Sequence, residues 1–83
     1  MLKHNHRFVE EYDGLVGFGA SREEDEATVI YYLQKFSDDQ LMALIRQRMS
    51  DEDLEGLFNL IGRLIKKHLT EDEYHAYFLK DEP

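Results

Sequence analysis

The 83-residue sequence contains no cysteine, and its only proline is the last residue. Without cysteine, the chain can form no disulfide, thiolate nucleophile or sulfur-ligated zinc site. Long apolar runs are also missing. Uncharged apolar runs, such as residues 57–62, are far shorter than the roughly 20 residues that a membrane-spanning helix needs. The basic N-terminus is not followed by an apolar signal-peptide core, so we expect a cytoplasmic protein without membrane association.

Basic residues are scarce as well, since 18 acidic residues against 10 basic ones give a net charge of −8. A negative surface repels phosphate backbones, whose binding depends on lysine and arginine, and we therefore expect no nucleic-acid partner. The one basic cluster, Arg63, Lys66 and Lys67, lies near the end of an apolar stripe, where positive charge stabilises the negative pole of a helix. With 42% hydrophobic residues and no evident linker, the sequence predicts one small folded domain over residues 1–83.

Four segments open with serine or threonine followed by an acid-rich turn, the pattern of a helix start. A hydroxyl at this position accepts a hydrogen bond from a free backbone N–H of the first turn, and the residue three positions later can bond back to the cap. The acids also face the positive pole of the helix dipole. The predicted starts are near Ser21, Ser37, Ser50 and Thr70.

Apolar residues recur at helical spacing after these starts, most clearly after Ser50, where a stripe continues for more than three turns. The stripe consists of Leu54, Leu57, Phe58, Ile61, Leu64 and Ile65. An N-terminal segment with Phe8, Val9 and Tyr12 is a candidate for a further helix. The helix starts and the helical spacing together predict an all-α fold. Because the connections are short, we predict a compact bundle of four to five short helices.

The stretch HLTEDEYH, residues 68–75, allows two interpretations. In one unbroken helix, His68, Glu71 and His75 would share a face and could bind a metal ion or small ligand. The apolar pattern instead breaks after Leu69, and Thr70 is a good helix cap, which favours two helices with His75 paired to Glu71. A zinc site also needs about four ligands, or three and a water. We expect no cofactor, and metal or ligand binding here is kept as an alternative hypothesis.

No catalytic motif is found. The glycine-rich segment 13–21 precedes a helix start, as a phosphate-binding loop would, but no strand comes before it and no Lys-Ser/Thr ending follows. We therefore interpret this segment as a connector. The serines at 21, 37 and 50 are assigned to helix caps, so the sequence does not predict an enzyme.

Five phenylalanines and five tyrosines exceed what so small a core readily encloses, so the sequence predicts apolar surface. We expect a protein–protein interaction module, acting as a homodimer or as an adaptor for another protein. Docking of the acidic surface on a basic protein is a further alternative. The candidate partner-facing residues, chosen for their positions beside the narrow stripes, are Phe18, Tyr31, Tyr32, Met42 and Leu60.

Two strings, KFSDDQLMALIRQRMSDEDL and IKKHLTEDEYHAYFLKD, lie in the part of the chain between roughly residues 33 and 81. In these strings the chain resembles a group of small cytoplasmic bacterial proteins of unassigned function. The resemblance implies a bacterial, cytoplasmic setting. It implies no catalytic residues, because the shared motifs concern helix capping and packing.

Overall fold

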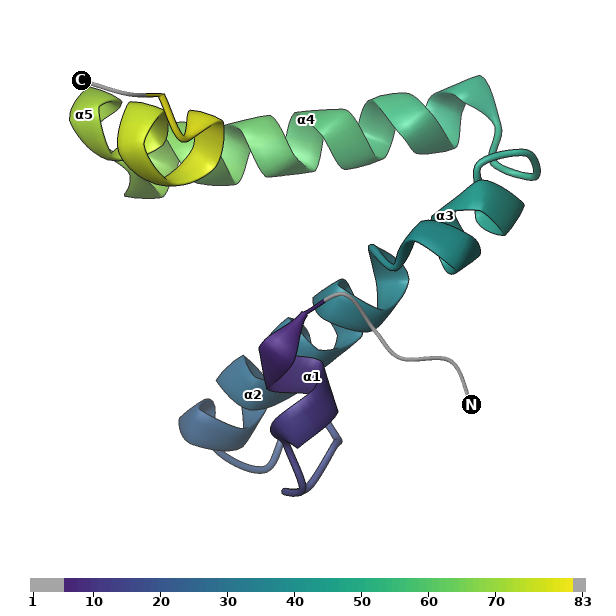
Figure 1. The fold of residues 1–83 in the computed structure, drawn as a ribbon, viewed down its shortest axis with the longest axis vertical. Coiled ribbons are helices and arrows are strands. Elements are labelled where there is room, and N and C mark those ends of the chain that lie inside the picture. Colours follow the sequence, from purple (N-terminus) through teal and green to yellow (C-terminus); the bar gives the residue numbers. More distant parts are fainter. Residues whose placement is uncertain (1–5, 82–83) are drawn as a thin grey trace. The chain divides into compact units, whose positions relative to one another are not determined.

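The computed structural model describes residues 6–81 of the protein. The predicted all-α class is confirmed, since 71% of these residues are helical and none of them forms a strand. Figure 1 shows the order of the elements along the chain. They are α1 (Arg7–Glu11), α2 (Arg22–Phe36), α3 (Asp39–Ile45), α4 (Asp51–His68), α5 (Glu71–Glu73) and the π-helix η1 (Tyr74–Leu79), which continues α5.

Three of the four predicted helix starts are capped by the expected residue. The Ser21 hydroxyl accepts from the Glu24 N–H at 3.1 Å. Ser50 and Thr70 each form a reciprocal capping box with the residue three positions later. In the box at Thr70, the hydroxyl accepts from the Glu73 N–H at 3.2 Å, and the Glu73 carboxylate accepts from the Thr70 N–H at 2.9 Å. Each box satisfies two backbone donors that a helix start leaves free.

The start near Ser37 lies one residue later than the cap expected from the sequence. Asp38 caps α3, because its carboxylate accepts from the Gln40 N–H at 3.0 Å. Ser37 instead ends α2, with its backbone N–H donating to the Leu33 carbonyl at 2.9 Å. The Ser37 hydroxyl donates to the Gln34 carbonyl at 3.4 Å, and with φ −83° and ψ 2° this residue still belongs to the end of α2, so the following aspartate, with ψ 136°, takes the role of cap.

By its internal contacts the chain divides into two units, Met1–Arg48 and Met49–Pro83, and each is described by itself. The single domain over residues 1–83 stays a prediction. In the first unit α1 packs against α2 (Figure 1). Between residues 6 and 81 only Val9 and Thr28, both in this unit, are less than a tenth exposed. The Val9 N–H donates to the Gln34 side chain at 3.0 Å, which ties α1 to α2.

The loop between α1 and α2 is held to α2 by side chains of that helix. The Thr28 hydroxyl accepts from the Gly17 N–H and donates to the Gly17 carbonyl, both at 3.1 Å. Asp25 accepts from the N–H of Gly19 at 2.7 Å, and Gly19 has a left-handed φ of 106°, which favours glycine. The glycine-rich segment is therefore a connector, and its N–H groups at 17 and 19 are used within the fold.

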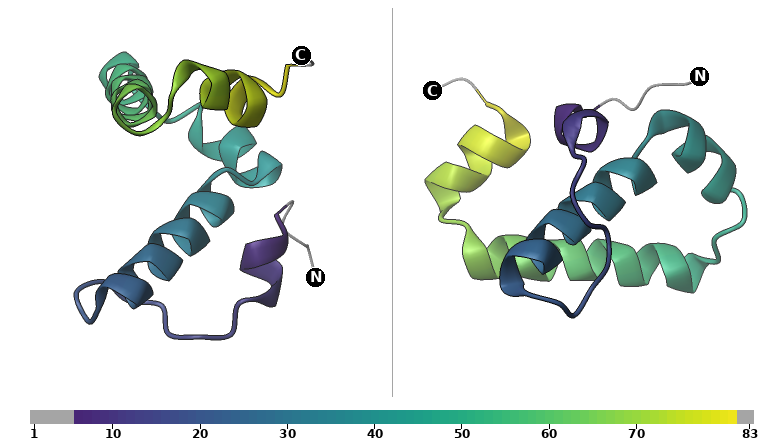
Figure 2. Two further views of the ribbon diagram at one scale, coloured as in Figure 1. Left: turned by 90° about the vertical axis from the view of Figure 1, so that its left-hand side faces the viewer. Right: turned by 90° about the horizontal axis from the view of Figure 1, so that it is seen from below.

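In the second unit the helix breaks where the sequence predicted. Leu69 has extended backbone angles, φ −114° and ψ 139°, and ends α4, and the capped Thr70 begins α5. Figure 2 shows the change of direction between α4 and α5. Among the described residues of this unit, 49–81, none is buried.

Candidate interaction surface

The surface of interest lies on α4, and local sequence explains why this helix forms. The capping box at Ser50 starts it, and acids occupy its first turn. Its last turn carries Lys66, Lys67 and His68. Acids near the positive pole and bases near the negative pole both stabilise a helix. The helix thus has an acidic end and a basic end, with an apolar side between them.

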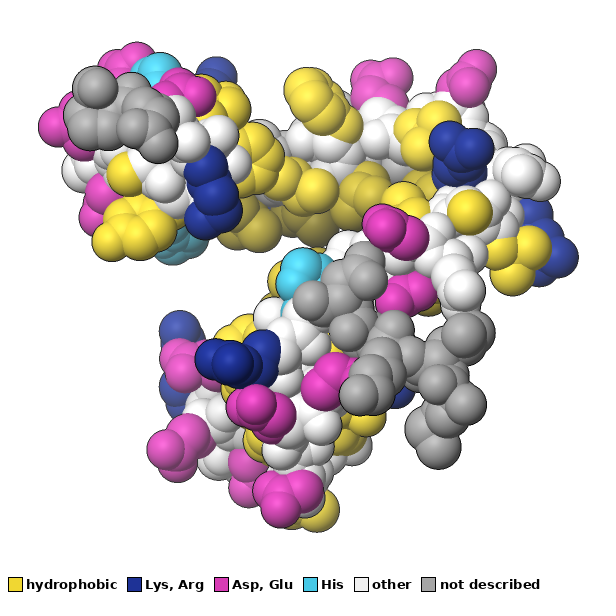
Figure 3. Space-filling view, viewed as in Figure 1, with side chains coloured by type: hydrophobic (Ala, Val, Ile, Leu, Met, Phe, Trp, Pro, Cys, Tyr) yellow, Lys and Arg dark blue, Asp and Glu magenta, His cyan; other side chains and the backbone are white. Residues whose placement is uncertain are grey.

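The apolar side, which we call the α4 face, consists of Leu54, Leu57, Leu60, Ile61 and Leu64. Their spacing places all five on one side of a helix with 3.6 residues per turn. Four of them are 43–45% exposed and Leu57 is half-buried. Phe58, at the edge of the face, is 76% exposed. Hydrophobic side chains run along α4 in the space-filling view (Figure 3).

A groove with a volume of about 680 Å³ lies between α4 and the α5–η1 segment. One wall is formed by Tyr74 and Phe78 of η1, whose rings stack with centroids 5.4 Å apart. The opposite wall includes Ile61 and Ile65 of α4. The α5–η1 segment therefore lies along the edge of α4 next to the α4 face, and it leaves the Leu57, Leu60 and Leu64 side free of that contact.

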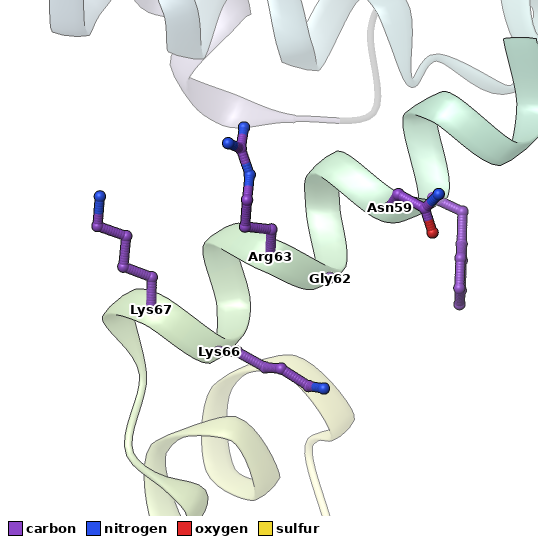
Figure 4. Close-up of a pocket in the computed structure, with 6 residues that line it drawn as sticks. Asn59, Gly62, Arg63, Lys66 and Lys67 are labelled. Carbon is purple, nitrogen blue, oxygen red and sulfur yellow. The ribbon is translucent and has the colours of Figure 1, made fainter.

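The basic residues near the end of α4 lie on different sides of the helix. Figure 4 shows Arg63 and Lys67 projecting to the same side, whereas Lys66 points away from them. With Asn59 and Gly62 they line a depression on the helix surface. Helical spacing places this depression on the side of α4 opposite the α4 face, and of these residues Lys67 alone borders the face, beside Leu60.

The structure exposes three of the five predicted partner-facing residues. Phe18 is 75% exposed, Tyr32 63% and Leu60 43%. Tyr31 and Met42 are half-buried. Tyr31 is covered in part by Tyr12, at 5.9 Å between ring centroids, and by the Lys35 ammonium, 4.9 Å from its ring. Four of the five residues belong to the first unit and Leu60 to the second, so neither unit holds them all.

Leu60 is the only residue of the α4 face that the sequence named as partner-facing. Leu54, Ile61 and Leu64 were identified as members of an apolar stripe, and they are 45%, 43% and 45% exposed in the structure. Helical periodicity identifies an apolar side but does not indicate what covers it.

The helix breaks in the histidine-rich stretch as the favoured hypothesis predicted, but the partner of His75 differs from the expected one. The His75 Nδ1 lies 2.9 Å from the Asp81 carboxylate, so its hydrogen-bond partner is Asp81 and the expected pairing with Glu71 is wrong. The hydrogen bond to Asp81 raises the pKa of His75 above its ordinary value of 6.5, and the negative charges of Asp81, Glu71 and Asp72 add to this. Glu71 thus affects His75 only through its charge.

The turn that brings Asp81 back to His75 is formed by the backbone. Lys80 adopts left-handed angles, φ 57° and ψ 38°, and its N–H donates to the His75 carbonyl. The Asp81 N–H donates to the same carbonyl at 2.9 Å.

Across residues 6–81, no three or more of the His, Asp and Glu side chains, His68, Glu71 and His75 included, are grouped so that they could hold a metal ion.

Comparison of the chain with protein-family models, with curated proteins and with solved structures gives no match. The resemblance to small bacterial proteins therefore stays a prediction. Within residues 6–81 no helix is long and apolar enough to cross a bilayer. The function must be argued from this chain's own surfaces.

Proposed function

We propose that this protein is a non-enzymatic interaction module that binds another protein chain through the α4 face, with a second copy of itself as the first candidate. The observation that carries the proposal is the exposure of 43–45% at Leu54, Leu60, Ile61 and Leu64, within a unit whose described residues are all incompletely buried. Burial of apolar surface is favourable by a free energy of about 25 cal/mol for each Å² removed from water. Side chains exposed in the isolated chain can gain this free energy by contact with a partner. Contiguous apolar surface of this kind marks interaction sites.

Two alternatives rank behind this proposal. Metal binding at His68, Glu71 and His75 has no geometric support in the part of the chain that the structure describes, and His75 already bonds to Asp81. Docking of the acidic surface on a basic protein has a simpler explanation for its acids. Those in the first turns of α2, α4 and α5 stabilise the helix starts.

A substitution on the α4 face tests the proposal directly. Leu64→Glu places a charge on the face, and because Leu64 is 45% exposed, the isolated chain tolerates it. Asn59→Glu introduces the same side chain on the opposite side of α4 and serves as the control. Light scattering coupled to size-exclusion chromatography, over a concentration series, measures self-association of the wild-type chain and both variants. Capture from an extract of the source cells, read by mass spectrometry, measures binding of other proteins.

We expect Leu64→Glu to lose an association that the wild-type chain and Asn59→Glu share. This association is either self-association into a dimer or binding of a captured protein, and both the wild-type chain and Asn59→Glu retain it. The proposal fails when Leu64→Glu matches the wild-type chain in both measurements. Circular dichroism of the two variants confirms that the helices remain formed.

A further inference from the structure

The α4 face has the spacing of a helix-pairing seam. Leu54, Leu57, Ile61 and Leu64 follow one another at three, four and three residues, the a and d positions of a heptad. Leu60 occupies the g position, which flanks such a seam, and Asp53 and Lys67 are the g positions one heptad before and after it. This pattern is typical of a helix that packs lengthwise against another helix.

The charges of α4 distinguish between the two directions in which a partner helix could lie. Acids occupy the first turn and bases the last turn. In a parallel pair of α4 helices, acids would face acids and bases would face bases. In an antiparallel pair the acidic end of each helix lies beside the basic end of the other, and the two helix dipoles also oppose each other.

We propose that α4 pairs antiparallel with α4 of a second copy of this chain, in a two-fold symmetric dimer. This inference rests on the proposed function and names its partner. One register joins Leu54 to Leu64 of the second copy, and Leu57 to Ile61 of the second copy. The same register brings Leu60 beside its own counterpart and Asp53 beside Lys67 of the second copy. A two-fold axis requires such self-complementarity, because each contact must occur twice.

The α5–η1 segment leaves room for this partner. Its Tyr74 and Phe78 face Ile61 and Ile65 of α4 across the groove. Leu57, Leu60 and Leu64 do not line this groove, and helical spacing turns them about 90° from the Ile61 and Ile65 edge. Because the seam runs only from Leu54 to Leu64, about 15 Å of helix, we expect a weak dimer with a dissociation constant of about the micromolar range.

Paired cysteines test the direction and the register. The chain has no cysteine of its own, so single cysteines can be introduced without competing thiols. Full-length Leu54→Cys and Leu64→Cys variants are oxidised with copper phenanthroline, each alone and as an equal mixture. In the antiparallel dimer, residue 54 and its own counterpart are about 15 Å apart along the axis, beyond the roughly 7 Å between Cα atoms that a disulfide allows. Residues 54 and 64 of different copies are neighbours.

We expect the mixture to give a disulfide-linked heterodimer and each variant alone to give little. Rapid linking of either variant to itself indicates a parallel pair and overturns the proposal. Absence of linking in all three samples, or equal linking in all three, also overturns it. A distinguishing tag on one variant separates heterodimers from homodimers on a gel.

Charge reversal provides a second measurement with a matched control. Lys67→Glu sets the new carboxylate against Asp53 of the second copy at both ends of the dimer, so we expect the dissociation constant to rise roughly threefold to tenfold. Lys66→Glu makes the same change of charge in the same turn but points away from Lys67 (Figure 4), and it serves as the control. The difference between the two variants shrinks in high salt.

A second substitution checks that Asp53 is the partner of Lys67. Asp53→Asn keeps an oxygen that can accept from the Ser50 N–H, as Asp53 does at 3.1 Å, and it removes the charge. In a chain that already carries Lys67→Glu, we expect Asp53→Asn to restore part of the lost dimer affinity. Equal weakening by Lys67→Glu and Lys66→Glu overturns this contact.

The two proposals fail in different ways. A wild-type chain that stays monomeric at high concentration overturns the α4–α4 dimer. The proposed function survives that result when another protein is captured in a manner that Leu64→Glu abolishes. Both fail when the chain is monomeric and Leu64→Glu changes nothing.

Discussion

The contacts inside one unit of the chain differ in kind from the contacts inside the other. In Met1–Arg48, side chains bond to backbone far away in sequence: Gln34 accepts from the Val9 N–H and Thr28 bonds to Gly17. In Met49–Pro83, the side-chain hydrogen bonds of the described residues join groups three to six positions apart. They lie between Ser50 and Asp53, Thr70 and Glu73, and His75 and Asp81. The first unit has tertiary polar contacts, and the second has local ones.

This difference in contacts corresponds to a difference in how far the apolar side chains of each unit are covered. Tertiary bonds in the first unit fix α1 and the loop against α2, and Val9 and Thr28 are buried there. Local bonds in the second unit define where helices begin and end, and the α5–η1 segment lies beside only the Ile61 edge of the α4 face. A unit specified mainly by helix ends leaves its apolar side available to a partner.

The largest effect is expected from breaking a tertiary bond of the first unit. Thr28→Val keeps the shape of the side chain and removes the hydroxyl that bonds twice to Gly17, both times at 3.1 Å. We expect the free energy of unfolding to fall by about 1 to 2 kcal/mol, because a partly buried donor and acceptor lose their partners. Urea denaturation followed by circular dichroism measures the change, and Thr28→Ser, which keeps the hydroxyl, is the control.

Hydrogen exchange shows which amides of each unit are affected by Thr28→Val. We expect Thr28→Val to speed exchange at the amides of residues 17 and 19 and across α2, and to leave α4 unchanged. Faster exchange throughout α4 would show that the two units unfold as one cooperative body, in agreement with the predicted single domain over residues 1–83.

The sequence predicted best what depends on neighbouring residues. The helix starts at Ser21, Ser50 and Thr70 and the break before Thr70 were all found, because a cap and its acids lie within four residues of each other. The one misplaced cap, Ser37 in place of Asp38, also has a local cause. Two adjacent residues can both cap, and here Ser37, with ψ 2°, still belongs to the end of α2, whereas Asp38, with ψ 136°, leaves the helical conformation as a cap does.

What the sequence did not predict depends on the fold. The bond between Thr28 and Gly17 joins residues 11 positions apart, and no spacing rule indicates it. The partner of His75 was wrong because the chain leaves the regular helix at η1 and reverses at Lys80, which brings Asp81 back. Of the α4 face only Leu60 was named as partner-facing, because periodicity identifies an apolar side but not what covers it.

A smaller effect is expected from breaking a local contact of the second unit. Thr70→Ala removes the hydroxyl that accepts from the Glu73 N–H at 3.2 Å. We expect a loss of about 1 kcal/mol, typical of a helix cap, confined to α5 and η1. Hydrogen exchange at the Glu73 amide measures it, and Thr70→Ser keeps the cap and is the control. A loss that spread through all of α4 would contradict the local character assigned to this unit.

The smallest effect concerns the contact that closes the C-terminal turn. The pKa of His75 is raised above 6.5 by its hydrogen bond to Asp81, so the contact favours the folded turn fully at pH values below about 6.5. It is lost as pH rises through the raised pKa of the folded state. We therefore expect the turn to be more ordered below about pH 6.5 than at alkaline pH.

An NMR titration of the His75 ring checks this directly. Asp81→Asn removes the carboxylate, and we expect the pKa of His75 to move down toward 6.5, because the largest cause of its rise is gone. Asp72→Asn removes a more distant negative charge, the last in order among the causes that raise this pKa, and should lower it less. An equal effect of the two substitutions would mean that the acidic field around η1 acts on His75 as a whole. The second unit would then owe this turn to summed charge rather than to one bond.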